Sequence, residues 1–242
     1  MNGRTGADYE DQVRRTIGFG NEALHAADAN IIQSEAAGGA GKRPAGRRMR
    51  RIGILGGSFN PAHGGHRHIS VLALKMLGLH EVWWMVSPQN PLKDAADMAP
   101  FDERMKAAKR VSRLPRIRVT DIERTVGTRY TVDTLNALVA LYPNYRFVWL
   151  MGADNLVQIS SWRGFETIFR TVPIAVFARP PYSSKALVGK AARVFARSRV
   201  DEKNVRRLAL MTPPAWVFLH TPTHAGSATR IRRHETGGQG GR

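Results

Sequence analysis

Residues 51–66 read RIGILGGSFNPAHGGH, and this stretch decides the fold. A short apolar run, residues 52–55, leads into a glycine-rich segment, residues 56–65, and apolar residues at helical spacing follow as far as Leu77. This order predicts a buried strand, a turn and a helix. The glycines let the backbone come close to a ligand, and a helix that begins near Gly64 directs free amide donors and its positive dipole end into the turn. The turn is therefore predicted to bind an anion.

The same alternation continues along the chain. Further strands are predicted at residues 82–86, 117–119, 147–151, 174–177 and 216–219. Helices are predicted at residues 101–111, 131–141 and 162–169, and a basic amphipathic helix at residues 186–200. Such alternation is typical of an α/β protein with a doubly wound, mostly parallel sheet, which binds ligands at the carboxyl ends of its strands. We predict one such domain over residues 51–234.

The two ends of the chain have a different composition. Residues 1–50 are rich in Ala, Gly, Asn and Gln and become strongly basic from Lys42 onward, so they are predicted to form a disordered basic arm. Met49 directly precedes the first strand, which raises the hypothesis that translation starts there. Residues 235–242 are glycine-rich and are predicted to form a flexible tail.

Composition narrows the class of protein. The 242 residues are 43% hydrophobic and contain no cysteine, which excludes a disulfide framework and a thiolate metal site. Neither a signal peptide nor an apolar run of about 18 residues is visible, so we expect a cytoplasmic protein without a membrane span. The net charge of +18 favours polyanionic partners but does not choose between nucleotides and nucleic acids.

The glycine-rich turn differs from the two best-known phosphate loops. It lacks the Gly-x-x-x-x-Gly-Lys-Ser/Thr spacing of a P-loop. The glycines at positions 53, 56 and 57 also do not form the Gly-x-Gly-x-x-Gly pattern of a dinucleotide fold. Its anion must therefore be held in another way.

Two histidines in this turn are the strongest candidates for chemistry. His63 and His66 lie three positions apart, so a helix starting at Gly64 puts both imidazoles on one side, where they can donate hydrogen bonds to phosphoryl oxygens. Two alternatives remain open on the residues alone. The pair could ligate a metal ion together with His68, or the turn could be purely structural.

Two segments resemble the signatures of a known superfamily. Residues 57–66 resemble the Gly-x-Phe-x-Pro-x-His-x-Gly-His signature of the nucleotidyltransferases, which include adenylyltransferases and cytidylyltransferases. Residues 227–232 resemble the Ile-Ser-x-Thr-x-x-Arg element that holds the triphosphate of ATP, although Gly226 replaces the leading Ile. The resemblance implies a Rossmann-like nucleotidyltransferase fold.

Further segments narrow the resemblance to the bacterial nicotinate-mononucleotide adenylyltransferases. Residues 129–135 are similar to the Ser-Tyr-Thr-x-x-Thr-Leu helix start of that family, and residues 152–156 to its Gly-x-Asp-x-Leu segment. Residues 161–168 are similar to its Trp-containing helix, and residues 91–93 supply a basic residue where the family has one. The segments occur in the family's order between residues 51 and 234.

The resemblance implies a role for each matching residue. The residues implied in catalysis are His63, His66, Lys93 and Arg232. Those implied in ATP binding are Gly57, Ser58, Phe59, His63, His66, Ser227, Thr229 and Arg232. Those implied in binding nicotinate mononucleotide are Ser58, Lys93, Tyr130, Thr131, Asp154, Trp162 and Arg179. The cofactor implied is Mg²⁺, held mainly by the phosphates of ATP rather than by protein ligands.

Simpler explanations exist for several of these residues. Trp162 could belong to the core, Asp154 and Thr131 could only cap helices, and Lys93 and Arg179 could be solvated charges. The implied activity is transfer of the adenylyl group of ATP to nicotinate mononucleotide in NAD biosynthesis. The alternatives are another adenylyltransferase of the superfamily, acting on nicotinamide mononucleotide or phosphopantetheine, and a basic nucleic-acid-binding module.

Overall fold

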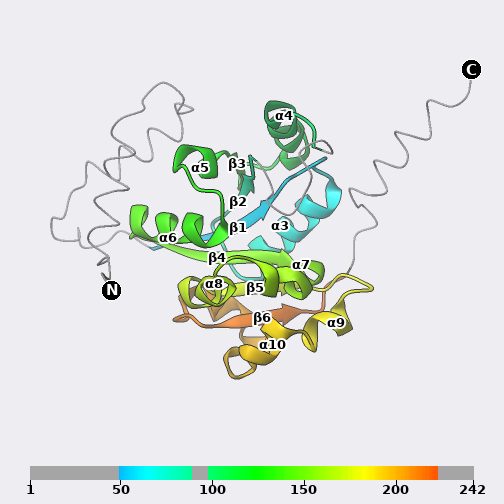
Figure 1. The fold of residues 1–242 in the computed structure, drawn as a ribbon, viewed down its shortest axis with the longest axis vertical. Helices are drawn as coiled ribbons and strands as arrows, with labels where there is room; N and C mark the ends of the chain where they lie inside the picture. Colours follow the sequence, from blue (N-terminus) through cyan, green and yellow to red (C-terminus); the bar gives the residue numbers. More distant parts are fainter. Residues whose placement is uncertain (1–48, 89–97, 223–242) are drawn as a thin grey trace, which may run out of the picture.

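A computed structural model describes residues 49–88 and 98–222 of the chain. In this part of the molecule six strands form one sheet in the order β3-β2-β1-β4-β5-β6, and every neighbouring pair is parallel (Figure 1). The strands are β1 (Arg50–Gly57), β2 (Glu81–Val86), β3 (Ile117–Thr120), β4 (Tyr145–Gly152), β5 (Ile174–Phe177) and β6 (Trp216–Leu219). The predicted α/β class, the doubly wound sheet and all six predicted strands are confirmed.

Helices connect the strands and cover the sheet on both faces (Figure 1). The α-helices are α3 (Gly64–Met76), α4 (Phe101–Ser112), α5 (Ile122–Thr125), α6 (Thr131–Leu141), α7 (Ala153–Gln158), α8 (Phe165–Thr171), α9 (Ser183–Leu187) and α10 (Lys190–Val194). The 3₁₀ helices are η2 (Ile159–Ser161), η3 (Ala196–Ser198) and η4 (Glu202–Leu210). The predicted helix start at Gly64 is confirmed. Across the described ranges, none of these helices has the length and apolar character needed to span a bilayer.

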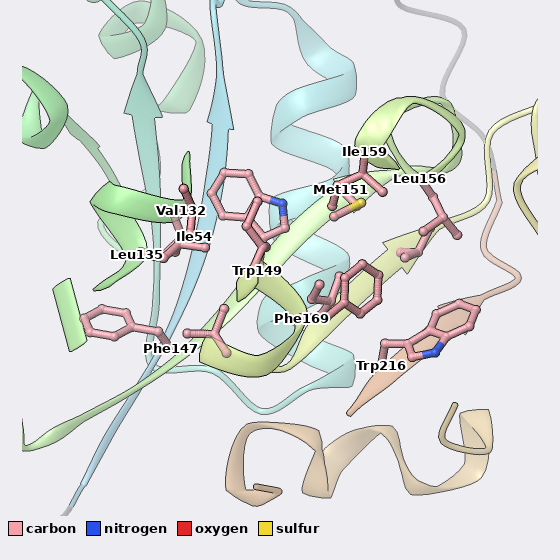
Figure 2. Packing of buried hydrophobic residues seen from close by; sticks show 14 of the residues in the cluster. Ile54, Val132, Leu135, Phe147, Trp149, Met151, Leu156, Ile159, Phe169 and Trp216 are labelled. Carbon is pink, nitrogen blue, oxygen red and sulfur yellow. The ribbon is translucent and has the colours of Figure 1, made fainter. Parts of the chain in front are cut away.

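Strand residues alternate between two hydrophobic cores, one on each face of the sheet. Trp149 and Phe147 of β4 point into the core under α6, α7 and α8, where Phe169 and Leu135 meet them (Figure 2). The alternating residues of β4, Val148 and Leu150, join the other core, which lies under α3 and α4. Because both faces are buried, the strands read as continuous apolar runs.

The order of the strands determines where a ligand can bind. The chain first builds β2 and β3 on one side of β1, and then crosses to build β4, β5 and β6 on the other side. Residues 55 and 150 are paired near the carboxyl ends of β1 and β4. In such sheets the loops diverge at this switch point, and the crevice outside the carboxyl ends of the two strands is the usual binding site.

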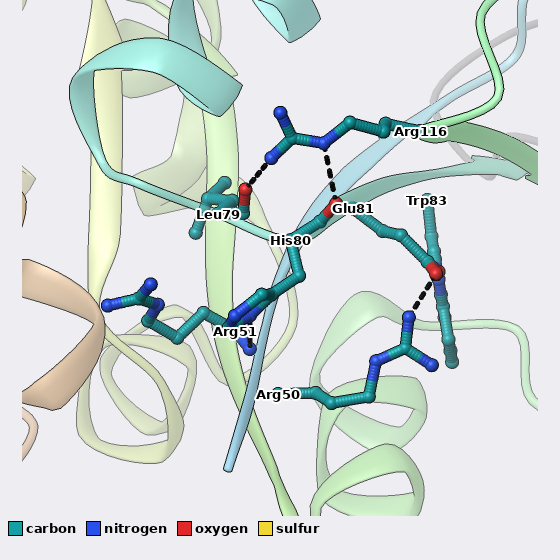
Figure 3. A network of polar contacts seen from close by, with 7 residues as sticks. All are labelled: Arg50, Arg51, Leu79, His80, Glu81, Trp83 and Arg116. Carbon is teal, nitrogen blue, oxygen red and sulfur yellow. Dashed lines mark hydrogen bonds and ion pairs between the residues drawn. The ribbon is translucent and has the colours of Figure 1, made fainter. Parts of the chain in front are cut away.

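At the opposite edge of the sheet, polar contacts tie the strand starts together (Figure 3). The N–H of Arg51 donates to His80 Nδ1 at 2.8 Å, and Arg116 Nε donates to the carbonyl of His80 at 2.9 Å. Burial and the neighbouring charges of Arg51, Arg50 and Arg116 lower the pKa of His80 below its usual range. Arg50 forms an ion pair with Glu81. These contacts join backbone segments and fix the ends of β1, β2 and β3.

Two helix predictions are wrong in detail, and a glycine explains each. The predicted helix at residues 162–169 begins only at Phe165, because Gly164 has a φ of 62°, which ends any right-handed helix arriving from Trp162. The predicted helix at residues 186–200 is broken into α9, α10 and η3, with Gly189 in an extended conformation between the first two.

Candidate active site

The turn after β1 is held in a strained conformation by a buried aromatic ring. Phe59 has a φ of 47°, a region that non-glycine residues rarely adopt, and its side chain is buried. Its ring stacks on Trp84 of β2, with 5.1 Å between ring centroids, and lies 4.7 Å from the ring of His66. Gly57 and Ser58 directly precede it. The three residues predicted to bind ATP in this turn therefore lie at the carboxyl end of β1, beside the histidine.

His63 and His66 are oriented by hydrogen bonds to the first turn of α3. His63 is the N-cap, and its Nδ1 accepts a hydrogen bond from the N–H of Gly65 at 3.1 Å. His66 Nδ1 accepts from the N–H of His63 at 3.2 Å. A neutral imidazole that accepts at Nδ1 carries its proton on Nε2, so both rings are donors at Nε2. The ring centroids are 3.9 Å apart, which brings the two predicted catalytic imidazoles together at a helix N-terminus.

A buried polar chain fixes α3 to the sheet below this pair. Ser70 Oγ donates to the backbone carbonyl of His66 at 2.8 Å, and Trp84 Nε1 donates to Ser70 Oγ at 2.7 Å. Ser70 and Trp84 are both fully buried. The position of the His66 backbone is thus determined by β2, and the imidazole pair is preorganised in the protein.

The segments that follow β4 and β5 contribute a carboxylate and a guanidinium, which form an ion pair. Arg179 Nη1 donates to Asp154 Oδ2 at 2.7 Å, while in the described part of the chain Asp154 Oδ1 is buried with no hydrogen-bond partner. A Cβ atom on Gly152 would lie 2.4 Å from Asp154 Oδ1, so the glycine leaves room for this carboxylate. The geometry joins two predicted site residues. Arg179 is thus ion-paired, and its side chain is also 43% exposed to solvent.

The residues predicted to hold the pyridine ring come together beside the α6 N-terminus. Trp162 follows η2, is half-buried and meets Trp149 edge-on at 6.5 Å between ring centroids. Arg163 lies over the ring of Tyr130 at 4.6 Å, which joins the Trp162 segment to Tyr130 and Thr131. The indole nitrogens of both tryptophans are buried, and neither has a hydrogen-bond partner within the described residues. Thr131 is the first residue of α6, after Tyr130 at the N-cap position.

Two buried charged residues near the carboxyl edge of the sheet were missed by the sequence analysis. Arg104 is 2% exposed and Glu123 is 5% exposed. Burial raises the pKa of Glu123 to about 7, and a hydrogen bond with Ser87 opposes that rise. Arg104 lies on the buried face of α4, beside Met105. A charged residue among the apolar positions of a helix was the signal in the sequence that could have identified it.

Four predicted residues belong to segments 89–97 and 223–242. These residues, which lie outside the described part of the chain, are Lys93, Ser227, Thr229 and Arg232.

The alternative that His63 and His66 ligate a metal ion required His68 as a third ligand. His68 Nε2 instead lies 2.8 Å from the backbone carbonyl of Pro222, and within residues 49–88 and 98–222 no three His, Asp or Glu side chains are grouped to hold a metal ion.

Comparison with known proteins identifies relatives across most of the chain. A protein of Parvibaculum lavamentivorans named "Probable nicotinate-nucleotide adenylyltransferase" is 52% identical over 188 residues, which cover 78% of this chain and 92% of that protein. A Methylorubrum extorquens protein of the same name is 49% identical over 182 residues, covering 75% and 98% of the two chains.

Solved structures share the fold. Nicotinic acid mononucleotide adenylyltransferase of Plasmodium falciparum, solved in complex with NaAD, superposes with a TM-score of 0.57 at 20% identity, covering 76% of this chain and 83% of that one. The sequence profile of the cytidylyltransferase-like family matches residues 54–234. The chain therefore belongs to the cytidylyltransferase-like family, among its nicotinate-nucleotide adenylyltransferases.

Proposed function

We propose that this chain transfers the adenylyl group of ATP to nicotinate mononucleotide, giving nicotinate adenine dinucleotide and pyrophosphate. The observation that carries the proposal is the pair of imidazoles at the start of α3, whose ring centroids lie 3.9 Å apart and whose Nδ1 atoms both accept backbone hydrogen bonds. Both rings then offer Nε2 as a donor at the switch point of the sheet. The names of the relatives support the same activity.

The reaction needs charge stabilisation rather than a covalent intermediate. A phosphate oxygen of the mononucleotide attacks the α-phosphorus of ATP, and the bond from that phosphorus to the pyrophosphate oxygen breaks in line. Negative charge is spread over the phosphoryl oxygens in the transition state. His63 and His66 donate hydrogen bonds there, and fixed donors of this kind need no reorganisation as the charge develops. Lys93 and Arg232 are proposed as further donors.

The site on the other side of the crevice suits a nicotinate. A carboxylate only accepts hydrogen bonds. Tyr130 makes no side-chain cap on α6, and its carbonyl accepts from the N–H groups of Asp133 and Thr134. The N–H groups of Thr131 and Val132, at the start of the helix, are proposed to donate to the nicotinate carboxylate. The half-buried ring of Trp162 offers a stacking surface for the pyridine. Asp154 is proposed to accept hydrogen bonds from the ribose hydroxyls.

Mg²⁺ is proposed to accompany ATP. Phosphate oxygens and water supply most of its ligands in nucleotide sites, so a protein cage is not required. When bound, the ion neutralises part of the triphosphate charge. The side chains of the described residues orient the two nucleotides and donate to the phosphoryl group.

The experiment is a product analysis with three acceptors. The purified full chain is incubated with ATP, Mg²⁺ and nicotinate mononucleotide, nicotinamide mononucleotide or phosphopantetheine, and the products are identified by mass. We expect nicotinate adenine dinucleotide and an equal amount of pyrophosphate with the first acceptor, and less product with the others. More product with either of the others would assign the alternative substrate. Absence of pyrophosphate, together with duplex DNA binding that weakens steeply with salt, would support the nucleic-acid module.

A further inference from the structure

Arg104 of α4 is a buried cation whose acceptors are all backbone carbonyls. A charge buried to 2% exposure is costly unless hydrogen bonds satisfy it. Its Nε donates to the carbonyl of Ala99 at 2.9 Å, and Nη1 donates to the carbonyls of Ser58 and Ser87 at 2.7 Å each. Nη2 donates to the carbonyl of Pro88 at 2.8 Å. The guanidinium thus joins the turn after β1, the end of β2 and the start of α4.

Further bonds bind the same segments to each other. The N–H of Ser87 donates to the carbonyl of Gly57 at 2.9 Å, and the N–H of Ala99 donates to Asn60 Oδ1 at 3.3 Å. The turn that contains Phe59 is therefore attached at Ser58 and at Asn60 to a framework centred on Arg104.

This turn supports the catalytic histidine. Phe59 has a φ of 47°, and such backbone strain persists only where the surroundings fix it. The ring of Phe59 lies against the ring of His66, with 4.7 Å between centroids, and against Trp84. A shift of Ser58 and Phe59 would consequently change the packing against which His66 is oriented.

We propose that Arg104 is a positioning residue for adenylyl transfer, which holds the Ser58–Asn60 turn so that Phe59 keeps His66 in its productive orientation. The proposal rests on the proposed function. A planar guanidinium with five donors in a fixed fork can bind four carbonyls from three directions, and the three donors of a lysine ammonium cannot reproduce that geometry. Arg104→Lys therefore keeps the charge and removes the framework.

The test compares Arg104→Lys with Arg116→Lys, its matched control. Arg116 also donates to backbone carbonyls, those of His80 and Leu79, but at the opposite edge of the sheet. All measurements are made at a temperature at which circular dichroism shows each variant fully folded. We expect Arg104→Lys to lower kcat about 100-fold, the scale that a misplacement of 1 Å can cost. We expect a smaller rise in KM for ATP, because Ser58 and Phe59 of this turn are also among the residues predicted to bind ATP. Arg116→Lys should keep the kcat of the original chain.

A second readout does not depend on catalysis. The imidazole signals of His66, assigned by comparison with His66→Gln, are expected to move in the NMR spectrum of Arg104→Lys and to stay in place in Arg116→Lys. Unmoved His66 signals, or a folded Arg104→Lys variant with an unchanged kcat, would overturn the proposal. Inactivity of the original chain would instead refute the proposed function, and the NMR comparison would still decide the role of Arg104.

A milder variant covers the case in which Arg104→Lys does not fold. Asn60→Ala removes the bond from Ala99 and leaves the guanidinium in place. We expect about a fivefold loss of kcat, which corresponds to the roughly 1 kcal/mol that a neutral hydrogen bond contributes. A kcat equal to that of the original chain in this variant would contradict the proposal.

Discussion

Arg179 and Asp154 form an ion pair across the carboxyl edge of the sheet, with 2.7 Å between Arg179 Nη1 and Asp154 Oδ2. The two residues are 25 positions apart and follow the neighbouring parallel strands β5 and β4. The pair holds one carboxylate oxygen of Asp154, and within the described residues the other is buried without a hydrogen-bond partner. A preorganised acceptor of this kind fits the ribose hydroxyls of a nucleotide.

Asp154→Asn should therefore weaken nicotinate mononucleotide binding. Hydrogen bonds to a charged group are worth about 1.5 to 3 kcal/mol, so KM for the mononucleotide should rise at least about tenfold, with a smaller change for ATP. Steady-state kinetics with each substrate varied checks this. The matched control is Glu166→Gln, which removes an exposed ion pair with Arg170 on α8 and should leave both constants unchanged. Equal KM values in the original chain and Asp154→Asn would leave Asp154 a structural residue.

His66→Ala should reduce the rate constant far more than substrate binding. Its Nε2 donor is proposed to act where charge develops, and removal of one such donor costs about 10²-fold or more in kcat. Pyrophosphate release at saturating substrates measures the loss. His80→Ala, which removes an imidazole at the opposite edge of the sheet, serves as the control. A His66→Ala variant with the kcat of the control would remove His66 from the catalytic residues.

Trp162→Ala should raise KM selectively for nicotinate mononucleotide. Aromatic stacking on a base is worth about 1 to 3 kcal/mol, or roughly tenfold or more in binding, and Trp162→Phe should recover much of it. The competing explanation is that Trp162 belongs to the hydrophobic core. In that case Trp162→Ala would lower the free energy of unfolding by about 3 to 5 kcal/mol. Both KM values and a urea midpoint decide between them. A large loss of stability with no selective effect on the mononucleotide would assign Trp162 to the core.

Glu123 should make the protein less stable as the pH rises from acid to neutral. Its pKa is raised from 4.5 to about 7 by burial, so the folded state keeps the proton over this window while the unfolded state has lost it. The free energy of unfolding falls with pH wherever the unfolded state binds fewer protons. The loss attributable to Glu123 is about 3 kcal/mol between these pKa values.

Urea unfolding at pH 5 and pH 8 tests this dependence, with Glu123→Gln as the comparison. A glutamine side chain has no proton to lose, so the variant should lose less stability over the interval than the original chain. If both proteins show the same change in the free energy of unfolding between the two pH values, Glu123 is not the group that titrates.

The sequence predicted the sheet and the histidine pair because both depend on local pattern. Each strand is an apolar run between turn residues, and the spacing of His63 and His66 within one helical turn already sets their proximity. The break before α8 was also visible, in Gly164, but the apolar spacing that follows it extended the predicted helix too far toward Trp162.

What the sequence could not predict depends on contacts between distant segments. Arg104 was missed: its position on the apolar side of α4 is a local signal, but its partners Ser58 and Pro88 are 46 and 16 positions away. They meet only because β1 and β2 are adjacent. The same holds for Arg179, which has no local signal that it pairs with Asp154.

The most direct test of the central claim is the initial rate of pyrophosphate release from ATP and nicotinate mononucleotide, measured in parallel for the full chain and for a variant with both His63→Ala and His66→Ala. The account predicts rapid release that requires the mononucleotide and is lost in the double variant, while both proteins have the same far-ultraviolet circular dichroism and so the same content of secondary structure. Release by the double variant at the original rate, or no release by the original chain above a protein-free blank, would contradict it.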